Sequence, residues 1–251
     1  SQQDSRYARQ TILPQIGESG QNRLANKKVL IAGSGGLGSV LSLYLAAAGI
    51  GQILIVDSDE VEISNLNRQI LHGKAFLGRP KVISAEKRLS DLNSSIRLIT
   101  KQERITKDNI DSFVADVDLI LDGTDNYDTR KVLNRASLRY GIPFIFGGVQ
   151  GFDGMVSVFI PGHTACFECI FRPPESETKT GVLGPAAGIS ASIQAMETIK
   201  VLLGIGQTLQ NRLLRFSGLD MKFSTTSIAM NPDCPACGNQ DTKRIKLHSK
   251  K

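Results

Sequence analysis

Histidine and cysteine are scarce in this chain of 251 residues, which contains three of the first and four of the second. The histidines, His72, His163 and His248, are scattered along the sequence. We assign none of them a role, so the chemistry of the chain is expected to need no catalytic histidine.

Long apolar runs are also missing. No run reaches the roughly 18 residues that a membrane span needs. The longest apolar helical run, 189–203, carries Glu197 and Lys200, which favours a buried helix of a soluble protein. The first ten residues contain no hydrophobic signal segment. We therefore expect a cytoplasmic protein with no membrane partner.

The composition is that of an ordinary globular protein, with 41% hydrophobic and 22% charged residues. Most of the net charge of +6 is local, because the tail 239–251 carries five lysines and arginines against one acid. Since the tail lacks interleaved aromatic residues, we read it as a flexible, solvated end and expect no nucleic-acid partner.

The most informative stretch is VLIAGSGGLG at 29–38. Four apolar residues predict a buried strand, the glycines predict a tight turn, and the run 39–48 predicts a helix. Gly33 permits the turn, Gly36 lets backbone N–H groups approach a phosphate, and Gly38 allows close helix packing. Asp57 ends the next strand, 53–57, where a ribose-binding carboxylate belongs. This pattern indicates a nucleotide-binding βαβ unit, but it does not choose between a hydride carrier and ATP.

Cations follow this unit. The polar segment 57–71 carries Arg68, and the helix predicted over 80–92 begins at Pro80 with Arg79 and Lys81 beside it. The start of a helix is the wrong end for cations, because its dipole is positive there. The conflict is relieved if an anion such as a triphosphate shares that space.

A third buried strand, in VDLILDGTDN at 117–126, ends in Asp122, Asp125 and Asn126. Ligands of open α/β sheets bind beyond the carboxyl ends of the strands. A carboxylate pair there is a natural Mg²⁺ anchor. Asp125 or Asn126 could equally cap the helix predicted over 127–140, and both roles could coexist.

The second half of the chain changes pattern. A short strand at 143–148 is followed by an alternating one at 154–160, a helix at 188–203, and a hairpin of 212–218 with 221–230. We predict an α/β fold: a Rossmann-like parallel half, about 27–150, continues into an antiparallel half, 151–238, as one mixed sheet flanked by helices. No linker divides it, so 1–238 is expected to be one domain.

The four cysteines form two CxxC pairs, Cys166 with Cys169 and Cys234 with Cys237. Four thiolates suit a tetrahedral structural Zn²⁺ site with no open coordination position. Disulfides are disfavoured because nothing suggests secretion. A redox role is disfavoured because neither pair is expected to open a helix in a thioredoxin-like unit. With all four cysteines used, no thiol remains for a covalent intermediate.

Eight motifs occur in the order GSGGLG, the strand ending at Asp57, SNLNRQ, GRPKV, DGTDN, CFEC, the QAMETIK helix and CPACG. Their combination, from Ser5 to about Gly238, resembles the ThiF/MoeB/HesA family, whose fold is shared with ubiquitin-activating enzymes. The resemblance implies ATP-dependent adenylation of the C-terminal Gly-Gly carboxylate of a small ubiquitin-like sulfur carrier protein, of the ThiS or MoaD type. It also implies a homodimer and a carrier-binding half at 151–238.

The resemblance assigns roles to matching positions. Gly36 and Asp57 would hold phosphate and ribose, Lys81 would contact phosphates, and Asp125 would organise Mg²⁺ with Asn126 beside it. The segment that would line the nucleotide comprises Ser64, Asn65, Leu66, Asn67 and Arg68. Arg9, in RYARQ, would reach into the partner subunit's site. Arg9, Arg68, Lys81 and Asp125 are thus the expected catalytic residues.

One departure from the family matters. Members often carry a cysteine between the first CxxC and the following helix, but 172–185 contains none. We also expect no C-terminal rhodanese-like domain. We therefore expect adenylation only, with sulfur delivered by a separate donor protein.

Other functions stay open at this point. The glycine-rich turn and Asp57 also suit an NAD-dependent oxidoreductase. An adenylating site could serve a short peptide or a modified tRNA. A non-catalytic scaffold is disfavoured because Arg9, Arg68, Lys81 and Asp125 occur together. The motifs do not distinguish thiamine from molybdopterin biosynthesis.

Overall fold

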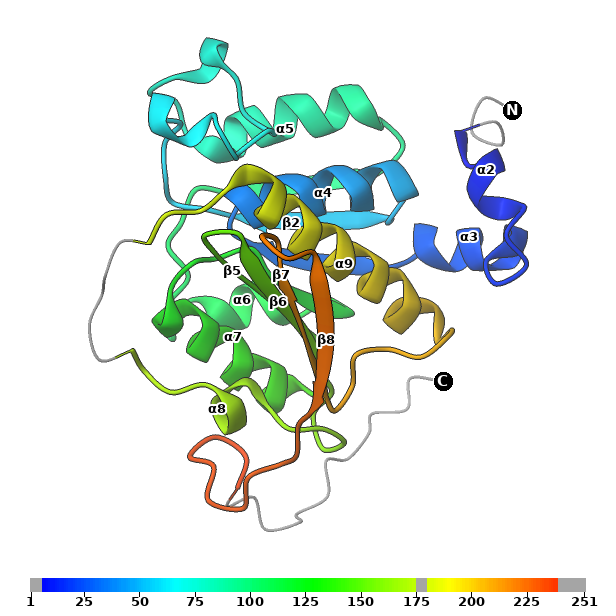
Figure 1. Cartoon of the computed structure of the whole chain (residues 1–251). Coiled ribbons are helices and arrows are strands. Elements are labelled where there is room, and N and C mark those ends of the chain that lie inside the picture. The colour runs from blue at the N-terminus through cyan, green and yellow to red at the C-terminus, as the bar shows by residue number, and fades with distance from the viewer. Residues whose placement is uncertain (1–5, 175–179, 239–251) are drawn as a thin grey trace.

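A computed structural model describes residues 6–174 and 180–238 of the chain (Figure 1). The tail 239–251, predicted to be flexible, and residues 175–179 of the predicted 172–185 loop lie outside the described residues.

The centre of the molecule is one eight-stranded sheet in the order β3-β2-β1-β4-β5-β6-β7-β8. The strands from β1 to β5 pair in parallel, and β5 to β8 pair antiparallel. The predicted mixed sheet is therefore confirmed. The strands are β1 (Lys28–Ala32), β2 (Gln52–Val56), β3 (Arg97–Lys101), β4 (Leu119–Asp122), β5 (Phe144–Gln150), β6 (Asp153–Phe159), β7 (Arg212–Ser217) and β8 (Lys222–Ser227).

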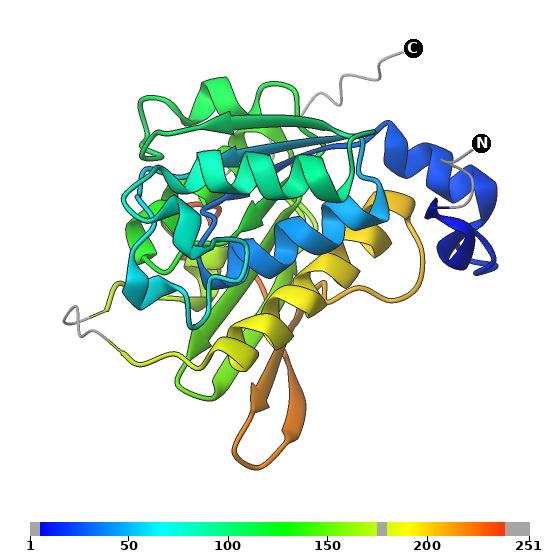
Figure 2. The same cartoon turned by 90° about the horizontal axis from the view of Figure 1, so that it is seen from above.

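Helices cover both faces of the parallel half (Figures 1 and 2). One layer packs α4 (Gly36–Ala48) between α5 (Lys81–Leu92) and α9 (Gly184–Leu203), and the other contains α6 (Ile110–Val114) and α7 (Tyr127–Tyr140). The short elements are α2 (Ala8–Thr11), α3 (Gly17–Ala25), α8 (Phe167–Ile170) and the 3-10 turns η1 (Ile63–Asn65) and η2 (Lys74–Phe76).

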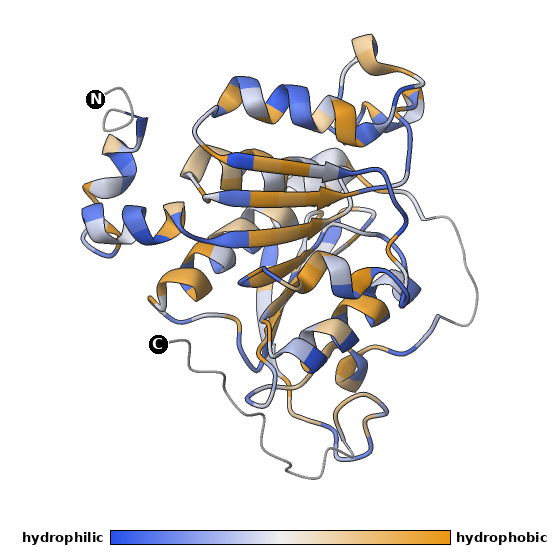
Figure 3. Ribbon diagram, turned by 180° about the vertical axis from the view of Figure 1, so that it is seen from behind, coloured by the Kyte–Doolittle hydropathy of each residue, from blue (hydrophilic) through white to orange (hydrophobic). Residues whose placement is uncertain are grey.

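Alternate residues of each parallel strand face opposite layers. Val29 and Ile31 of β1 pack with α4 and α9, whereas Leu30 and Ala32 pack on the side of α6 and α7. Both faces are buried, so the central strands are apolar except at their ends (Figure 3). This explains the unbroken apolar runs in the sequence.

Two helix starts differ from the prediction. Pro80 lies just before α5 with extended backbone angles, φ −52° and ψ 134°, so it caps the helix rather than opening it. Helix α9 begins at Gly184, four residues before the predicted start, because Pro185 is tolerated in its first turn. The longer α9 therefore reaches the glycine-rich turn.

The antiparallel half ends in an exposed hairpin. β8 is exposed along its whole length, and the hairpin of β7 and β8 projects beyond the body of the molecule (Figure 2). None of the helices in the described ranges is long and apolar enough to cross a membrane.

Candidate functional site

The glycine-rich turn joins β1 to α4. Gly33 has φ +86°, which favours glycine. A β-carbon on Gly38 would lie 2.0 Å from the carbonyl oxygen of Gly33, so the first turn of α4 packs directly on the loop. Within residues 6–174 and 180–238, no side chain caps the N-terminus of α4, where Gly35 is the N-cap residue. Its first N–H groups and the positive end of its dipole are therefore suited to an anion.

Asp57 holds this turn. Its Oδ2 accepts hydrogen bonds from the backbone nitrogen of Ser34 at 2.7 Å and from the Ser34 hydroxyl at 2.8 Å. Its Oδ1 accepts a bond from the backbone nitrogen of Asp59 at 2.9 Å. The Asp57 side chain is buried at the end of β2. The carboxylate predicted to bind ribose therefore also fixes the glycine-rich turn.

The predicted nucleotide-lining segment begins with a capping box. The side chain of Asn65 accepts from the backbone nitrogen of Glu62 at 3.1 Å, and the Ser64 hydroxyl donates to Glu62 at 3.2 Å. The Arg68 guanidinium donates to the Ser64 carbonyl at 3.1 Å and to the Asn67 side chain at 3.0 Å. These contacts order the segment.

Arg68 lies beside the glycine-rich turn. A β-carbon on Gly36 would lie 3.6 Å from the Arg68 Cγ and 3.4 Å from the Ala187 β-carbon. A β-carbon on Gly184, at the start of α9, would lie 2.7 Å from the Asn67 carbonyl oxygen. The N-termini of α4 and α9 therefore converge on this segment, which brings Arg68 to the predicted phosphate site.

Gln69 and His72 follow Arg68 on the same side of the glycine-rich turn. The sequence predicted no role for either residue. His72 Nε2 lies 2.9 Å from the Ser34 carbonyl oxygen, so this nitrogen carries the proton and donates it. In residues 6–174 and 180–238, His72 Nδ1 and Gln69 Oε1 are buried without a hydrogen-bond partner. Burial lowers the pKa of His72, although the bond to Ser34 opposes the shift. In the sequence, only the apolar residues between Gln69 and His72 indicate that this segment is buried.

Lys81 is almost wholly buried at the start of α5, and its ammonium pairs with the Asp59 carboxylate at 2.9 Å. The Asp59 side chain is 64% exposed, whereas that of Lys81 is 6% exposed. A buried ammonium with an exposed, hydrated partner can exchange that partner for a phosphate at small cost. The position of Lys81 therefore suits the predicted phosphate contact.

The sequence predicted that a pair of carboxylates after β4 would anchor Mg²⁺. For Asp122 this prediction is wrong. This side chain is fully buried, and it accepts bonds from Arg130 at 2.8 Å and from the Thr124 hydroxyl at 2.7 Å. Burial raises the pKa of Asp122, while the charge of Arg130 and the bonds from Thr124 oppose the rise. Asp122 thus serves the structure of the loop, and Asp125 alone is exposed for a cation.

Asn126 caps α7, because its side chain accepts from the backbone nitrogen of Thr129 at 2.8 Å. The predicted helix cap is therefore confirmed for Asn126, and a ligand role for Asp125 stays a prediction. One exposed carboxylate fits Mg²⁺, which is commonly bound by one or two carboxylates together with substrate phosphates. Asp125 would hold such an ion.

The loop after β4 touches the glycine-rich turn directly. A β-carbon on Gly33 would lie 2.9 Å from the Gly123 carbonyl oxygen and 3.5 Å from the Thr124 methyl group. The structure therefore gathers most of the predicted site residues around one turn, at the carboxyl edge of β1, β2 and β4. The set comprises Gly36, Asp57, Asn67, Arg68, Lys81 and Asp125.

Arg9 lies apart from this group. Its neighbour Gln10 donates to the carbonyl of Ala48, the last residue of α4, at 3.1 Å. Gly36 begins the same helix. A helix of this length spans about 20 Å, so Arg9 cannot reach the glycine-rich turn of its own chain. Its exposed side chain makes no hydrogen bond or ion pair within the described residues.

The four cysteines meet at one point. All four sulfur atoms lie within 4.8 Å of one another, with Cys166 to Cys234 at 3.6 Å and Cys169 to Cys237 at 3.4 Å. Tetrahedral Zn²⁺ with Zn–S bonds of about 2.3 Å needs sulfurs about 3.8 Å apart. Burial raises the pKa of the Cys166 thiol to about 12 and also raises that of Cys237. The cluster fits Zn²⁺, whose binding would displace these protons.

Cys166 directly precedes α8, a helix of a single turn between β6 and α9. The proximity of the second pair favours a metal site over a redox site.

Helix α7 supports this cluster. The Asn134 side chain donates to Cys166 Sγ at 3.6 Å and to Glu168 at 3.2 Å, and Arg135 binds both oxygens of Glu168. The same helix begins beside Asp125, so one rigid element connects the cysteine cluster to the candidate nucleotide site.

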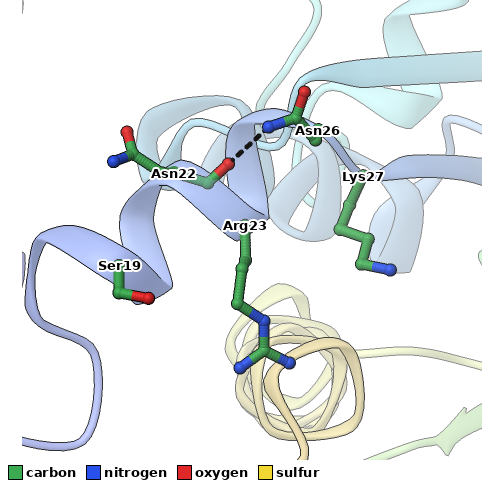
Figure 4. Close-up of a pocket in the computed structure, with 5 residues that line it drawn as sticks. All are labelled: Ser19, Asn22, Arg23, Asn26 and Lys27. Carbon is green, nitrogen blue, oxygen red and sulfur yellow. Dashed lines mark hydrogen bonds between the residues drawn. The ribbon is translucent and has the colours of Figure 1, made fainter.

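A cavity of about 600 Å³ on the outside of α3 is separate from this site (Figure 4). It is lined by Ser19, Asn22, Arg23, Asn26 and Lys27. Arg23 donates to the carbonyl of Leu203, at the last residue of α9, at 2.9 Å. The glycine-rich turn adjoins the other end of α9, about 30 Å away for a helix of this length.

Comparison with known proteins decides the family. Residues 7–236 match the ThiF family. The chain belongs to the ThiF family. It is 40% identical over 250 residues to the sulfur carrier protein adenylyltransferase of Thermus thermophilus, covering 95% of this chain and 92% of that one. It is 39% identical over 247 residues to the SAMP-activating enzyme E1 of Haloferax volcanii, covering 96% and 91%.

A solved structure of Escherichia coli MccB with ATP is similar, with a TM-score of 0.83, 26% identity, and coverage of 93% of this chain and 73% of that one. Membership of the ThiF family confirms the predicted family and fold class, and together with the ATP-bound MccB structure it supports ATP binding. It also confirms the prediction of an adenylyltransferase over that of an NAD-dependent oxidoreductase.

Proposed function

We propose that this ThiF-family chain adenylates the C-terminal Gly-Gly carboxylate of a small ubiquitin-like sulfur carrier protein, of the ThiS or MoaD type. The observation that carries the proposal is that Arg68 packs against Gly36 at the N-terminus of α4, beside two further site elements. The loop that leads to the exposed Asp125 contacts Gly33, and Lys81 pairs with Asp59, whose backbone binds Asp57. The names of the Thermus and Haloferax relatives support the substrate class.

In this proposal the carrier carboxylate attacks the α-phosphorus of ATP, the bond to the bridging oxygen breaks, and pyrophosphate leaves. Such phosphoryl chemistry depends on positioning and charge neutralisation more than on an acid or a base. Arg68 and Lys81 neutralise the phosphates, and Asp57 holds the ribose. Asp125 would hold Mg²⁺, which would supply further positive charge to the phosphates.

Arg9 acts in trans in this proposal, in a homodimer. Its distance from the turn of its own chain supports that assignment, because a cation fixed about 20 Å away serves only a neighbouring subunit's site. The site therefore gains its third cation only on dimerisation.

We infer that the reaction stops at the acyl-adenylate. Cys166, Cys169, Cys234 and Cys237 cluster together, which suits a closed structural Zn²⁺ site and leaves no cysteine in the sequence free for a covalent intermediate. A separate donor protein would supply sulfur. We expect residues 1–238 to act as a single adenylating domain in the cytoplasm.

A short peptide is the second candidate substrate. It is favoured by the structure of the microcin C7 biosynthetic enzyme MccB in complex with N-formylated MccA, to which this chain is similar with a TM-score of 0.84 and 25% identity. The two candidate substrates, a carrier protein and a short peptide, differ in what the carboxylate is attached to. The adenylation reaction is the same for both.

ATP–pyrophosphate exchange separates these candidates. Purified chain is incubated with ATP, Mg²⁺, labelled pyrophosphate and one candidate at a time: a ThiS-type carrier, a MoaD-type carrier, or peptides. Each carrier is matched by a form lacking its final Gly-Gly. Exchange that needs an intact carrier supports the main proposal, exchange with peptides alone supports the second, and exchange with neither contradicts both.

A further inference from the structure

Arg130, on the second turn of α7, is a mostly buried cation with no role in the chemistry above. Its Nε donates to Asp122 Oδ2 at 2.8 Å, and a terminal nitrogen donates to the carbonyls of Thr124 at 2.7 Å and Gly147 at 3.0 Å. The guanidinium carbon also lies 5.1 Å from the centre of the Phe146 ring. One side chain thus ties β4, β5 and the loop before Asp125 together.

Asp122 completes this arrangement from the other side. Its Oδ1 accepts bonds from the backbone nitrogen of Thr124 at 2.9 Å and from the Thr124 hydroxyl at 2.7 Å. Arg130 binds the carbonyl of the same residue. Both backbone polar groups of Thr124 are therefore fixed by one buried ion pair.

Asp125 itself has no such support. It is exposed and makes no hydrogen bond or ion pair within residues 6–174 and 180–238. Its direction therefore depends on the backbone on either side, which is fixed at Thr124 by the ion pair and at Asn126 by the helix cap. Of these two supports, the ion pair is the one that also reaches the neighbouring strand β5.

We propose that Arg130 is a positioning residue, which aims the Asp125 carboxylate at the nucleotide by clamping Thr124 between β4 and β5. The proposal rests on the nucleotide site of the proposed function. A lysine would keep the charge but not the clamp, because its single ammonium cannot reproduce the planar donors that Nε and the terminal nitrogen present to three acceptors.

A double-mutant cycle tests the proposal. ATP affinity is measured by calorimetry, in Mg²⁺ and in EDTA, for the wild type, Arg130→Lys, Asp125→Asn and the double variant. We expect Arg130→Lys to weaken binding about tenfold in Mg²⁺ and less than twofold in EDTA, a coupling within the usual range for residues acting together. In the Asp125→Asn background, adding Arg130→Lys should change affinity less than twofold. The matched control is Arg139→Lys on the same helix, where Arg139 pairs with Asp111 at the surface.

Additive losses, or a loss of equal size in EDTA, would overturn the proposal. If Arg130→Lys fails to fold, judged by its melting temperature and zinc content, Thr124→Val replaces it in the same cycle, since it removes the hydroxyl bond to Asp122 and leaves the guanidinium in place. The double-mutant cycle measures ATP affinity and needs no carrier protein. Failure of the proposed function, seen as a wild type with no carrier-dependent exchange, is therefore distinguishable from failure of this inference.

Discussion

The Asp57 carboxylate holds Ser34 twice, through its backbone nitrogen at 2.7 Å and through its hydroxyl at 2.8 Å. The end of β2 thereby fixes the turn after β1, and His72 binds the remaining carbonyl of the same serine. The polar groups of Ser34 are thus occupied by protein, which holds the turn in place. The turn is therefore preorganised, and the first N–H groups of α4 remain for an anion.

Ser34→Ala should weaken both the fold and the site. The variant leaves a buried carboxylate with one donor fewer, which lowers the free energy of unfolding by about 1.5 to 3 kcal/mol. Urea denaturation measures this loss, and calorimetry should show weaker ATP binding. The control is Ser112→Ala, which removes an exposed hydroxyl that donates to the Asn109 carbonyl. It should change the free energy of unfolding by less than about 0.5 kcal/mol. Equal effects from both variants would contradict the anchoring role of Ser34.

His72 should make the protein sensitive to mild acid. Burial lowers its pKa in the fold, whereas an unfolded histidine titrates near 6.5. The unfolded chain therefore binds more protons as the pH falls below about 6.5, and stability declines. Lys81 favours the neutral ring and Asp57 the charged one. The melting temperature of the wild type should fall between pH 7.5 and 5.5, and that of His72→Gln should fall less. Parallel curves would exclude His72 as the source.

Zinc binding should weaken in acid. Because the pKa of Cys166 is raised to about 12 in the absence of metal, protons compete with Zn²⁺ throughout the neutral range. Metal analysis at pH 7.5 should find about one zinc per chain. A colorimetric chelator should then remove it faster at pH 5.5 than at pH 8. Cys234→Ser should lose zinc and melt at a lower temperature, and retained zinc in that variant would contradict a four-cysteine site.

Arg9 should complement its partner's site. Arg9→Ala and Arg68→Ala chains should each be inactive in carrier-dependent exchange. Mixing them should restore about half of wild-type activity per mixed dimer, because one of its two sites then has both arginines. Differently tagged chains allow the mixed dimer to be purified. Mixed dimers that stay inactive would show that the two arginines do not share a site across the interface.

Features of the fold could be predicted from the sequence where the signal for them lies within a few neighbouring residues. The strand before Gly33 and the helix from Tyr127 to Tyr140 were predictable, because apolar runs, glycine turns and an Asn126 cap act over a few residues. The convergence of the two CxxC pairs was also predictable, because the coordination chemistry of Zn²⁺ restricts the spacing of its ligands.

The partners of buried polar groups were not predictable in this way. Asp122 and Asp125 stand three residues apart in the same polar loop, yet one is fully buried against Arg130 and the other is exposed. Which of them faces solvent depends on the packing of α7 against β4 and β5. The contact of His72 with Ser34 likewise could not be predicted from the sequence, because it depends on the fold.

We propose that this chain adenylates the C-terminal carboxylate of a carrier protein and forms no covalent intermediate of its own. Intact-mass spectrometry of a ThiS-type or MoaD-type carrier, incubated with the chain, ATP and Mg²⁺ in the presence of pyrophosphatase, tests it most directly. We predict a carrier heavier by one adenylate, which disappears when pyrophosphatase is replaced by excess pyrophosphate, and a chain of unchanged mass. An unmodified carrier, or a carrier covalently attached to a cysteine of the chain, would contradict the account.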